Sequence, residues 1–260
     1  LLTYITKKHR NNNFPIFVIE YISMRKELSL NADVGEGSTT DQALMPFLTH
    51  CSIACGGHYG DKKTIDHTLD LAVKNRVKVG AHPSYPDREN FGRSALAVSQ
   101  ELLMESLTAQ LQLMTDRCQQ KGIKLDHIKP HGRFYNDLHH DKDLANAWLN
   151  LLQQTFKQSV TILVAPNSAV HEEAKGRNFP YLVEVFADRN YRDDGSLVSR
   201  KEAYAIITDK EVFKKRLDEL ADKKQITSIN GKKLTVQFDT LCIHSDSNAI
   251  VENLKFTFRQ

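Results

Sequence analysis

Short apolar segments alternate along the chain with longer stretches in which apolar residues recur at helical spacing. The clearest of these stretches runs from Ser99 to Lys121, where apolar residues return at every third or fourth position and predict a helix with one buried face. Seven apolar segments have the length of buried strands, and they lie near Leu28, Ser52, Val77, His127, Thr161, Leu182 and Thr240. This alternation predicts βαβ units and a parallel sheet.

Polar residues mark the ends of several predicted helices. Asp61 and Ser99 offer side-chain acceptors directly before helical patterns, and Gly122 follows the second pattern. Further helices are predicted over residues 41–50, 141–156, 167–176 and 210–223. Residues 236–238 are expected either to extend the last strand or to form a short extra strand. The loop at 83–94 is rich in proline, glycine and charge, which favours a functional role over a plain connection.

The number of strands decides which architecture this pattern predicts. An ideal (β/α) barrel has eight strands, and seven are visible in this sequence. We therefore predict an α/β fold, a single-domain, distorted, seven-stranded (β/α) barrel, with an open doubly wound sheet as the alternative. No break in composition divides residues 24–260, whereas residues 1–23 look foreign to the domain. We expect those residues to form a dispensable N-terminal extension.

Composition and charge narrow the classes of function. The chain has 260 residues, of which 40% are hydrophobic and 26% charged, as is typical of a globular protein. Its net charge of +3 gives no electrostatic footprint for a nucleic acid or an anionic membrane. The four cysteines form no Cys-x-x-Cys pair, and the apolar stretch at 14–22 is too short to span a membrane. We expect a cytoplasmic protein with reduced thiols.

Six of the predicted strands run into a histidine or an aspartate. These residues are Asp33, His58, His82, His131, Asp188 and, after the last strand, His244 and Asp246. In a parallel barrel the C-terminal ends of the strands share one face, and active sites lie on that face. We therefore expect acid, base and metal-ligand groups to surround one cavity.

Other polar residues accompany these strand ends. The segment from Asn31 to Gly37 carries a second carboxylate at Glu36, which leaves the strand between two glycines. Lys129 ends a buried strand, where an ammonium group is costly unless it is paired. Arg93 and Arg189 are candidate cations for a carboxylate or a phosphate.

Three motifs of other enzyme classes are missing from the sequence. The chain has no P-loop of the form Gly-x-x-x-x-Gly-Lys-Ser/Thr, so any nucleotide site in it is of another kind. It also has no Gly-x-Ser-x-Gly elbow and no His-Glu-x-x-His pair. Nucleophilic serine chemistry and the usual zinc-protease chemistry are therefore disfavoured.

Seven motifs stand in one order between residues 27 and 250. They are LNADVGEG (30–37), IACGGH (53–58), GAHP (80–83), FGR (91–93), KPHG (129–132), EVFADR (184–189) and LVSR (197–200). The set resembles the LamB/YcsF family. The resemblance implies a barrel related to the glycoside hydrolase/deacetylase superfamily. It also implies 5-oxoprolinase activity, the ATP-dependent opening of 5-oxo-L-proline to L-glutamate, with two partner subunits called B and C.

The chain departs from the family pattern at four positions. The family usually has Gly-Phe-His-Ala-Gly where Gly57 and Tyr59 flank His58 in this sequence. It usually has Asn in place of Ser52 and Gly in place of Ser245. The catalytic-type histidines and aspartates remain. The departures therefore concern the shape of the pocket near His58 and Tyr59 more than the type of reaction.

The implied chemistry suits these residue types. A five-membered lactam is a stable amide, and ATP can activate its oxygen as a phosphate ester. The enzyme then needs cations for the phosphate charge, a base for water and an acid for the leaving nitrogen. We hypothesise that Asp33 and Glu36 serve as base or metal ligands. The acid/base groups or ligands would be His58, His82 and His131, so that Asp33, His82 and His131 form a candidate site for a divalent metal.

The cations and the remaining strand-end residues have separate expected roles. Lys129, Arg93 and Arg189, together with Asn31, would hold the carboxylate of the substrate or a phosphate. Asp188 is a further candidate catalytic residue, and His244 and Asp246 would orient the catalytic centre.

Two other functions remain open from the sequence. The first is a metal-dependent amidase or sugar deacetylase on the same barrel, which predicts chelator-sensitive activity without ATP. The second is a non-catalytic component that binds a lactam or a sugar while its partners do the chemistry. That function predicts substrate binding and a turnover that does not respond to changes at the histidines and aspartates.

Overall fold

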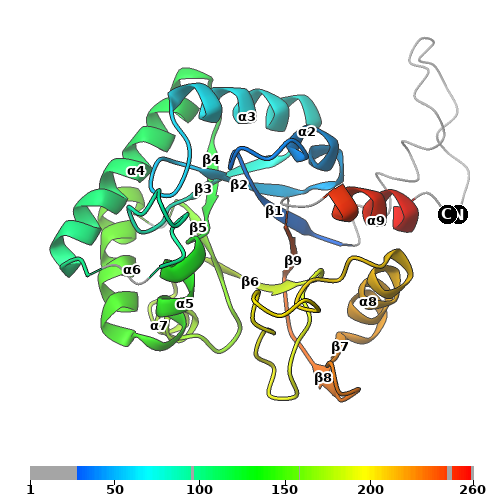
Figure 1. Cartoon of the computed structure of the whole chain (residues 1–260). Helices are drawn as coiled ribbons and strands as arrows, with labels where there is room; N and C mark the ends of the chain where they lie inside the picture. Colours follow the sequence, from blue (N-terminus) through cyan, green and yellow to red (C-terminus); the bar gives the residue numbers. More distant parts are fainter. Residues whose placement is uncertain (1–27, 95–96, 158, 245–247, 259–260) are drawn as a thin grey trace, which may run out of the picture.

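Seven parallel strands close into a barrel in the computed structural model, which describes residues 28–94, 97–157, 159–244 and 248–258 (Figure 1). Around the barrel the strands are β1 (Leu30–Val34), β2 (His50–Ala54), β3 (Lys78–His82), β4 (Leu125–Ile128), β5 (Thr161–Val164), β6 (Tyr181–Phe186) and β9 (Thr240–Ile243). The barrel closes where β9 pairs with β1, with Leu241 opposite Leu30. The predicted seven-stranded barrel is confirmed, and the open sheet is excluded.

Helices surround the barrel on its outer side (Figure 1). They are α2 (Asp41–Leu44), the 3₁₀ helix η1 (Met45–Phe47), α3 (Lys62–Asn75), α4 (Gln100–Gln120), α5 (Gly132–His140), α6 (Lys142–Phe156), α7 (Ala169–Gly176), α8 (Lys210–Lys223) and α9 (Asn248–Phe258). A small antiparallel hairpin of β7 (Gln225–Thr227) and β8 (Lys233–Thr235) follows α8. None of the helices in the described ranges combines the length and the apolar character that crossing a bilayer requires.

The predicted helix starts follow from side-chain capping. Asp61 accepts a hydrogen bond from the backbone of Thr64, whose hydroxyl accepts one in return from the backbone N–H of Asp61. Ser99 and Asp141 cap α4 and α6 in the same way, each by one side-chain acceptor. These bonds satisfy donors that a helix N-terminus otherwise leaves without partners.

Several predicted boundaries were wrong, each for a local reason. The helix expected over 41–50 ends at Phe47, because Pro46 sits in a 3₁₀ turn and His50 already belongs to β2. The extra strand expected at 236–238 lies at β8 instead, where it pairs with β7. The sequence pattern did not reveal α5, whose buried residues are only Phe134 and Leu138. It did not reveal α9 either.

Polar side chains fill the interior of the barrel and lead up to the candidate site at the C-terminal ends of the strands. On β1, Asn31 and Asp33 face inward because side chains alternate along a strand, and Asn31 donates to Thr240 Oγ1 on the neighbouring strand β9. Further along the axis, Ser52 Oγ and His127 Nε2 lie 3.2 Å apart. The apolar core therefore lies outside the barrel, between the strands and the helices, where α6 contributes the fully buried Trp148.

The predicted N-terminal extension at residues 1–23 falls outside the described residues, and its dispensability stays a prediction. Deletion of these residues tests it directly, because folding and activity are expected to survive the deletion.

Candidate active site

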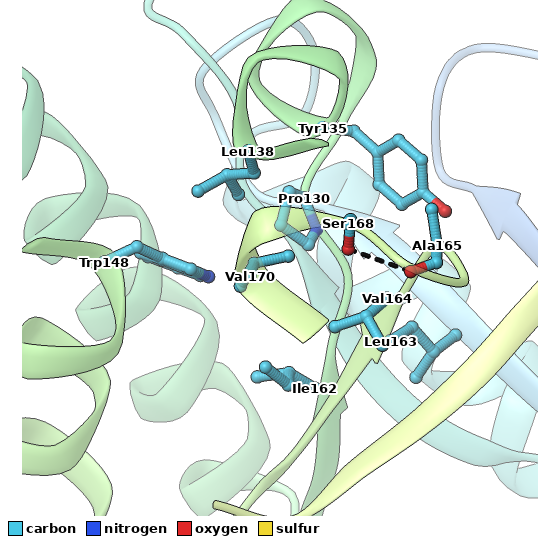
Figure 2. Close-up of a pocket in the computed structure, with 10 residues that line it drawn as sticks. All are labelled: Pro130, Tyr135, Leu138, Trp148, Ile162, Leu163, Val164, Ala165, Ser168 and Val170. Carbon is cyan, nitrogen blue, oxygen red and sulfur yellow. Dashed lines mark hydrogen bonds between the residues drawn. The ribbon is translucent and has the colours of Figure 1, made fainter. Parts of the chain in front are cut away.

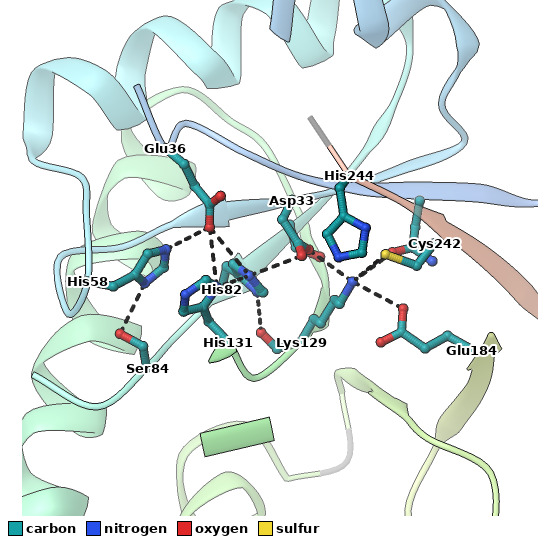
Figure 3. A network of polar contacts seen from close by, with 12 residues as sticks. Asp33, Glu36, His58, His82, Ser84, Lys129, His131, Glu184, Cys242 and His244 are labelled. Carbon is teal, nitrogen blue, oxygen red and sulfur yellow. Dashed lines mark hydrogen bonds and ion pairs between the residues drawn. The ribbon is translucent and has the colours of Figure 1, made fainter. Parts of the chain in front are cut away.

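The C-terminal ends of the strands bring the predicted polar residues together on one face of the barrel, as expected (Figure 3). A cavity of about 690 Å³, including the open space at its mouth, lies there. Its walls include Asp33, Glu36, His82, Lys129, His131 and His244. Asp246 lies outside the described residues, so its role stays a prediction. Ser245, one of the positions that depart from the family pattern, lies outside them as well.

One group of side chains in this site consists of Glu36 and three histidines. Glu36 Oε1 lies 2.8 Å from His58 Nε2, 3.3 Å from His131 Nδ1 and 3.7 Å from His82 Nε2. His131 Nδ1 and His82 Nε2 are 2.9 Å apart. The rings of His58 and His131 stack with their centroids 3.7 Å apart. We call these four residues the Glu36–histidine cluster.

Each of the three histidines has one ring nitrogen that points into the cluster, which we call the inner nitrogen, and one that points away from it, the outer nitrogen. Each outer nitrogen has a partner behind the cluster. His82 Nδ1 lies 2.7 Å from the carbonyl oxygen of Lys129, and His131 Nε2 lies 2.9 Å from that of Phe91. His58 Nδ1 lies 3.0 Å from Ser84 Oγ. Phe91 and Ser84 belong to the loop at 83–94, so this loop holds the rings of His131 and His58 in place.

Burial sets the protonation of the cluster. Burial, with the neighbouring His82 acting in the same direction, lowers the pKa of His58 to about 2. It also lowers the pKa of His131 to about 3, with His82 and His58 acting in the same direction. His82 differs: burial would lower its pKa, but the carboxylates of Asp33 and Glu36 together raise it above its usual value. His58 and His131 are therefore neutral at neutral pH.

A second group surrounds the ammonium of Lys129. Nζ lies 3.0 Å from Asp33 Oδ1 and 3.1 Å from Glu184 Oε2, and it donates to Asn31 Oδ1 at 3.2 Å. Burial alone would lower the pKa of Lys129, but the two carboxylates raise it well above its usual value. Burial would likewise raise the pKa of Asp33, yet His82 and Lys129 hold it well below its usual value. The predicted pairing of Lys129 is thus present.

The two groups meet at Asp33. Its Oδ1 faces Lys129, and its Oδ2 lies 3.4 Å from His82 Nε2. Asn31 was predicted to bind substrate, but its side chain is fully buried. It accepts a hydrogen bond from Lys129 Nζ, so it can influence the cavity only through that ammonium group. Because its pKa is held so low, Asp33 can orient a water molecule but acts as a base only if the proton passes on to the neighbouring histidine.

A third group pairs Asp188 with His244 at the far side of the cavity. Asp188 accepts from the backbone N–H of His244 at 2.8 Å, and both of its oxygens lie 3.0 Å from His244 Nδ1. Burial would raise the pKa of Asp188, but His244 lowers it below its usual value. This carboxylate holds Nδ1 of His244, which leaves Nε2 for the cavity.

Three arginines, Arg93, Arg189 and Arg200, line the cavity. Arg93 lies over the ring of Phe91, with 4.9 Å between its guanidinium carbon and the ring centroid. Arg189 donates to the carbonyl oxygens of Val198 and Ala205, so it also ties together the loop that follows β6. The sequence had pointed to Arg93 and Arg189 but had given Arg200 no role.

Sequence reasoning grouped Glu184 with Asp188 and Arg189 but gave it no role, and it gave none to Tyr135 or Cys242 either. Glu184 lies inside β6 and points into the barrel toward Lys129, and Cys242 Sγ accepts from the same ammonium at 3.1 Å. Tyr135 lines the cavity from α5, and its pKa is raised well above its usual value by burial and by the nearby Glu184. A glutamate inside an otherwise apolar strand was the one signal that could have indicated this group.

Tyr135 also borders a smaller, mostly apolar cavity between α5, α6, α7 and β5 (Figure 2). Its other walls include Leu138, Trp148 and Ile162, and Ser168 Oγ donates to the carbonyl of Ala165. The cavity is a packing gap behind the barrel wall, and it brings together no acid, base or cation.

The positions that depart from the family pattern near His58 do not line the main cavity. A Cβ added to Gly57 would overlap Ser84 Oγ and Gln110 Oε1. The hydroxyl of Tyr59 covers Gly37, where a Cβ would lie 2.6 Å from it. The two departures thus change the packing behind His58 rather than the walls of the main cavity.

Comparison with known proteins places the chain in a protein family. The chain matches the model of the LamB/YcsF family over residues 28–259. It is 38% identical over 234 residues to the A subunit of a 5-oxoprolinase from Campylobacter jejuni, covering 88% of this chain and 91% of that protein. It is 36% identical over 223 residues to the A subunit of a 5-oxoprolinase from Haemophilus influenzae, covering 85% and 90%.

A solved structure shares the fold as well. The crystal structure of a lactam utilization protein from Thermus thermophilus superposes with a TM-score of 0.81 at 29% sequence identity. The match covers 90% of this chain and 96% of that one.

Proposed function

Because the chain belongs to the LamB/YcsF family, we propose that it is the A subunit of a 5-oxoprolinase. In this proposal it opens 5-oxo-L-proline to L-glutamate with hydrolysis of ATP, together with partner subunits B and C. The relatives that carry this name support the proposal, and because the name is that of a subunit, it also supports the existence of partners. The absence of a P-loop from the sequence suits a nucleotide site that a partner completes.

The observation that carries the proposal is the placement of Asp33 in the cavity. Its carboxylate is held ionised between Lys129 and His82, with Arg93 and Arg200 on the same cavity wall. Hydrolysis of an amide needs a base for water, an acid for the leaving nitrogen and cations for developing negative charge. The cavity offers all three within reach of a small carboxylate-bearing ring.

The proposed reaction begins with activation of the lactam. The lactam oxygen attacks the γ-phosphorus of ATP, and ADP leaves. Water gives a proton to Asp33 and adds to the lactam carbon. That proton passes through a cavity histidine to the nitrogen as the C–N bond breaks, and the added hydroxyl gives its own proton to Asp33 as it becomes the carbonyl of an acyl phosphate. A second water releases phosphate and completes glutamate. Lys129 and the arginines offset the negative charge of the carboxylate and the phosphoryl group.

The test is release of glutamate from 5-oxoproline with ATP, measured first with this chain alone and then with its B and C partners. Asp33→Ala and His131→Ala are expected to abolish turnover in the complex without unfolding the chain. His140→Ala is the matched control, because His140 lies at the end of α5 and away from the cavity. Turnover near that of the wild type in Asp33→Ala and His131→Ala would assign the chemistry to the partners and leave this chain a binding component.

The Glu36–histidine cluster favours one alternative, a metal-dependent amidase or sugar deacetylase on the same barrel. Three imidazoles and a carboxylate that converge on one point are typical of metal-assisted hydrolysis. This alternative predicts hydrolysis by the chain alone, without ATP, that a chelator stops. The measurement with the isolated chain therefore separates the two functions.

A further inference from the structure

We propose that Glu36, His58, His82 and His131 bind one divalent transition-metal ion of the zinc class. The inference rests on the proposed function only in taking lactam opening as the reaction that the ion serves. The sequence had suggested Asp33, His82 and His131. The structure points to a different set, in which Glu36 and His58 join the two histidines and Asp33 stands beside them.

The first argument comes from the hydrogen bonds of His82 and His131. Their outer nitrogens face the carbonyl oxygens of Lys129 and Phe91, and a carbonyl oxygen can only accept. Each outer nitrogen must therefore carry a proton. In the neutral ring the inner nitrogen then presents a lone pair. The two inner nitrogens, His82 Nε2 and His131 Nδ1, face each other at 2.9 Å. Two lone pairs at this distance need a cation between them, which is a shared proton without the ion and the metal ion itself once it is bound.

His58 is fixed in the same way through a hydroxyl group. Ser84 Oγ donates its single proton to the carbonyl of Tyr85 at 2.8 Å, so toward His58 Nδ1 it can only accept. His58 Nδ1 must therefore be the donor, and its Nε2 presents a lone pair to Glu36 Oε1, which is 2.8 Å away. An outer hydrogen bond that fixes the tautomer and turns a lone pair inward is the usual arrangement of a metal-binding histidine.

The distances within the cluster suit a tetrahedral ion. With metal–ligand distances of about 2.0–2.1 Å, two ligand atoms of a tetrahedron lie roughly 3.3 Å apart. The four measured contacts among the inner atoms range from 2.8 Å to 3.7 Å, and all four atoms lie within 4.8 Å of one another. Only small side-chain shifts separate this arrangement from a coordinated ion.

The backbone holds the ligands in place. Glu36, His58, His82 and His131 come from the ends of four successive strands, β1 to β4. The loop residue Gly92 packs directly on two of them, because a Cβ there would lie 3.0 Å from His131 Cδ2 and 3.0 Å from His58 Cβ. Because the four ligands are already held in position, binding of the ion does not have to order them.

The donor set selects the kind of ion. Three imidazole nitrogens with one carboxylate oxygen suit Zn²⁺ and its neighbours, whereas Mg²⁺ prefers oxygen ligands and retains water. The cavity reaches Glu36, His82 and His131, so a substrate oxygen or a water molecule can approach the ion from that side. Such an ion would polarise a carbonyl or lower the pKa of a bound water, next to the carboxylate of Asp33.

The test measures binding without substrate or ATP, so its outcome is independent of 5-oxoprolinase activity. The full chain is stripped with a chelator, dialysed and titrated with Zn²⁺ in a calorimeter. Co²⁺ is added in a parallel experiment, because its visible absorption reports a tetrahedral site. We expect one equivalent of each ion to bind and an excess of Mg²⁺ not to compete.

Four variants assign the site. Glu36→Gln and His131→Gln remove a ligand and are expected to lower Zn²⁺ affinity by more than tenfold, whereas His140→Gln, outside the cluster, leaves it unchanged. Ser84→Ala retains all four ligands but removes the acceptor of His58 Nδ1, and is expected to lower the affinity by about 10–100-fold. It serves as the second test if a ligand variant fails to fold. Absence of stoichiometric binding, or binding unchanged in the Glu36, His131 and Ser84 variants, would overturn the proposal.

Discussion

Lys129 and Asp33 form an ion pair at the C-terminal end of the barrel, with 3.0 Å between Nζ and Oδ1. The two side chains are only 2% and 13% exposed, so solvent screens their attraction little. Through its other oxygen Asp33 reaches His82, while Lys129 reaches Glu184 on β6. This pair therefore couples the polar interior of the barrel to the Glu36–histidine cluster.

Lys129→Met should destabilise the fold strongly. The change leaves the carboxylates of Asp33 and Glu184 buried without their cation, and removal of one partner of a buried ion pair typically costs about 3–5 kcal/mol. The measurement is the free energy of unfolding in urea. The double variant Lys129→Met with Glu184→Gln should recover part of the loss, because it removes one of the two isolated charges. A stability of Lys129→Met equal to that of the wild type would contradict this account of the pair.

Asp188→Asn should lower turnover in the reconstituted complex by about 100-fold or more, the usual effect of removing acid–base assistance. The carboxylate of Asp188 accepts from both N–H groups of His244, whereas an amide offers one acceptor and would favour the wrong tautomer of the ring. His244→Ala should cause a similar loss. The double variant should be no worse than either single one, because the two residues act as a unit. Additive losses would show that Asp188 acts independently of His244.

The strand ends could be predicted from the sequence because each one joins an apolar segment to a polar residue. That pattern correctly placed Asp33, His82 and His131 around one cavity. It did not identify Glu184 as the second carboxylate beside Lys129, because Glu184 lies within a strand and only the closed barrel shows that it points inward. The contacts that fix the histidine rings were also beyond prediction, since the carbonyls of Phe91 and Lys129 belong to the backbone and leave no trace in residue type.

Gly80→Ala should destabilise the barrel by about 1–3 kcal/mol, the usual cost of overpacking a core. Gly80 lies in β3, and an added Cβ would overlap the ring of His127 inside the barrel. Gly176→Ala is the matched control, since a Cβ at the end of α7 meets no atom within 4 Å of it. The control should be neutral or more stable by up to ~1 kcal/mol, because alanine suits a helix better than glycine. Thermal or urea unfolding of both variants measures the contrast, and equal stabilities would show that the barrel interior adapts freely.

Asp41 should make the stability of the fold depend on pH. It begins α2, and its Oδ2 accepts from the backbone N–H of Gly35, next to the Glu36 turn. Burial raises the pKa of Asp41 from 3.8 to about 6, although the bond from Gly35 and the charge of His67 lower it in part, and Glu36 raises it. Between pH 3.8 and about pH 6, the folded protein therefore binds more protons at Asp41 than the unfolded chain does. Stability should therefore fall as pH rises through this window, and the full penalty should be present above about pH 6.

Asp41→Asn isolates this effect, because the amide oxygen can still accept from Gly35 while the group no longer titrates. The free energy of unfolding of each protein is measured at about pH 4 and about pH 7, and only the difference between the two proteins is compared. Relative to the wild type, Asp41→Asn should gain on the order of 2–3 kcal/mol in stability between the lower and the higher pH. Other titrating groups contribute equally to both proteins and cancel. A difference that stays constant with pH, or that changes in the opposite direction, would mean that Asp41 is already ionised without penalty in the folded state.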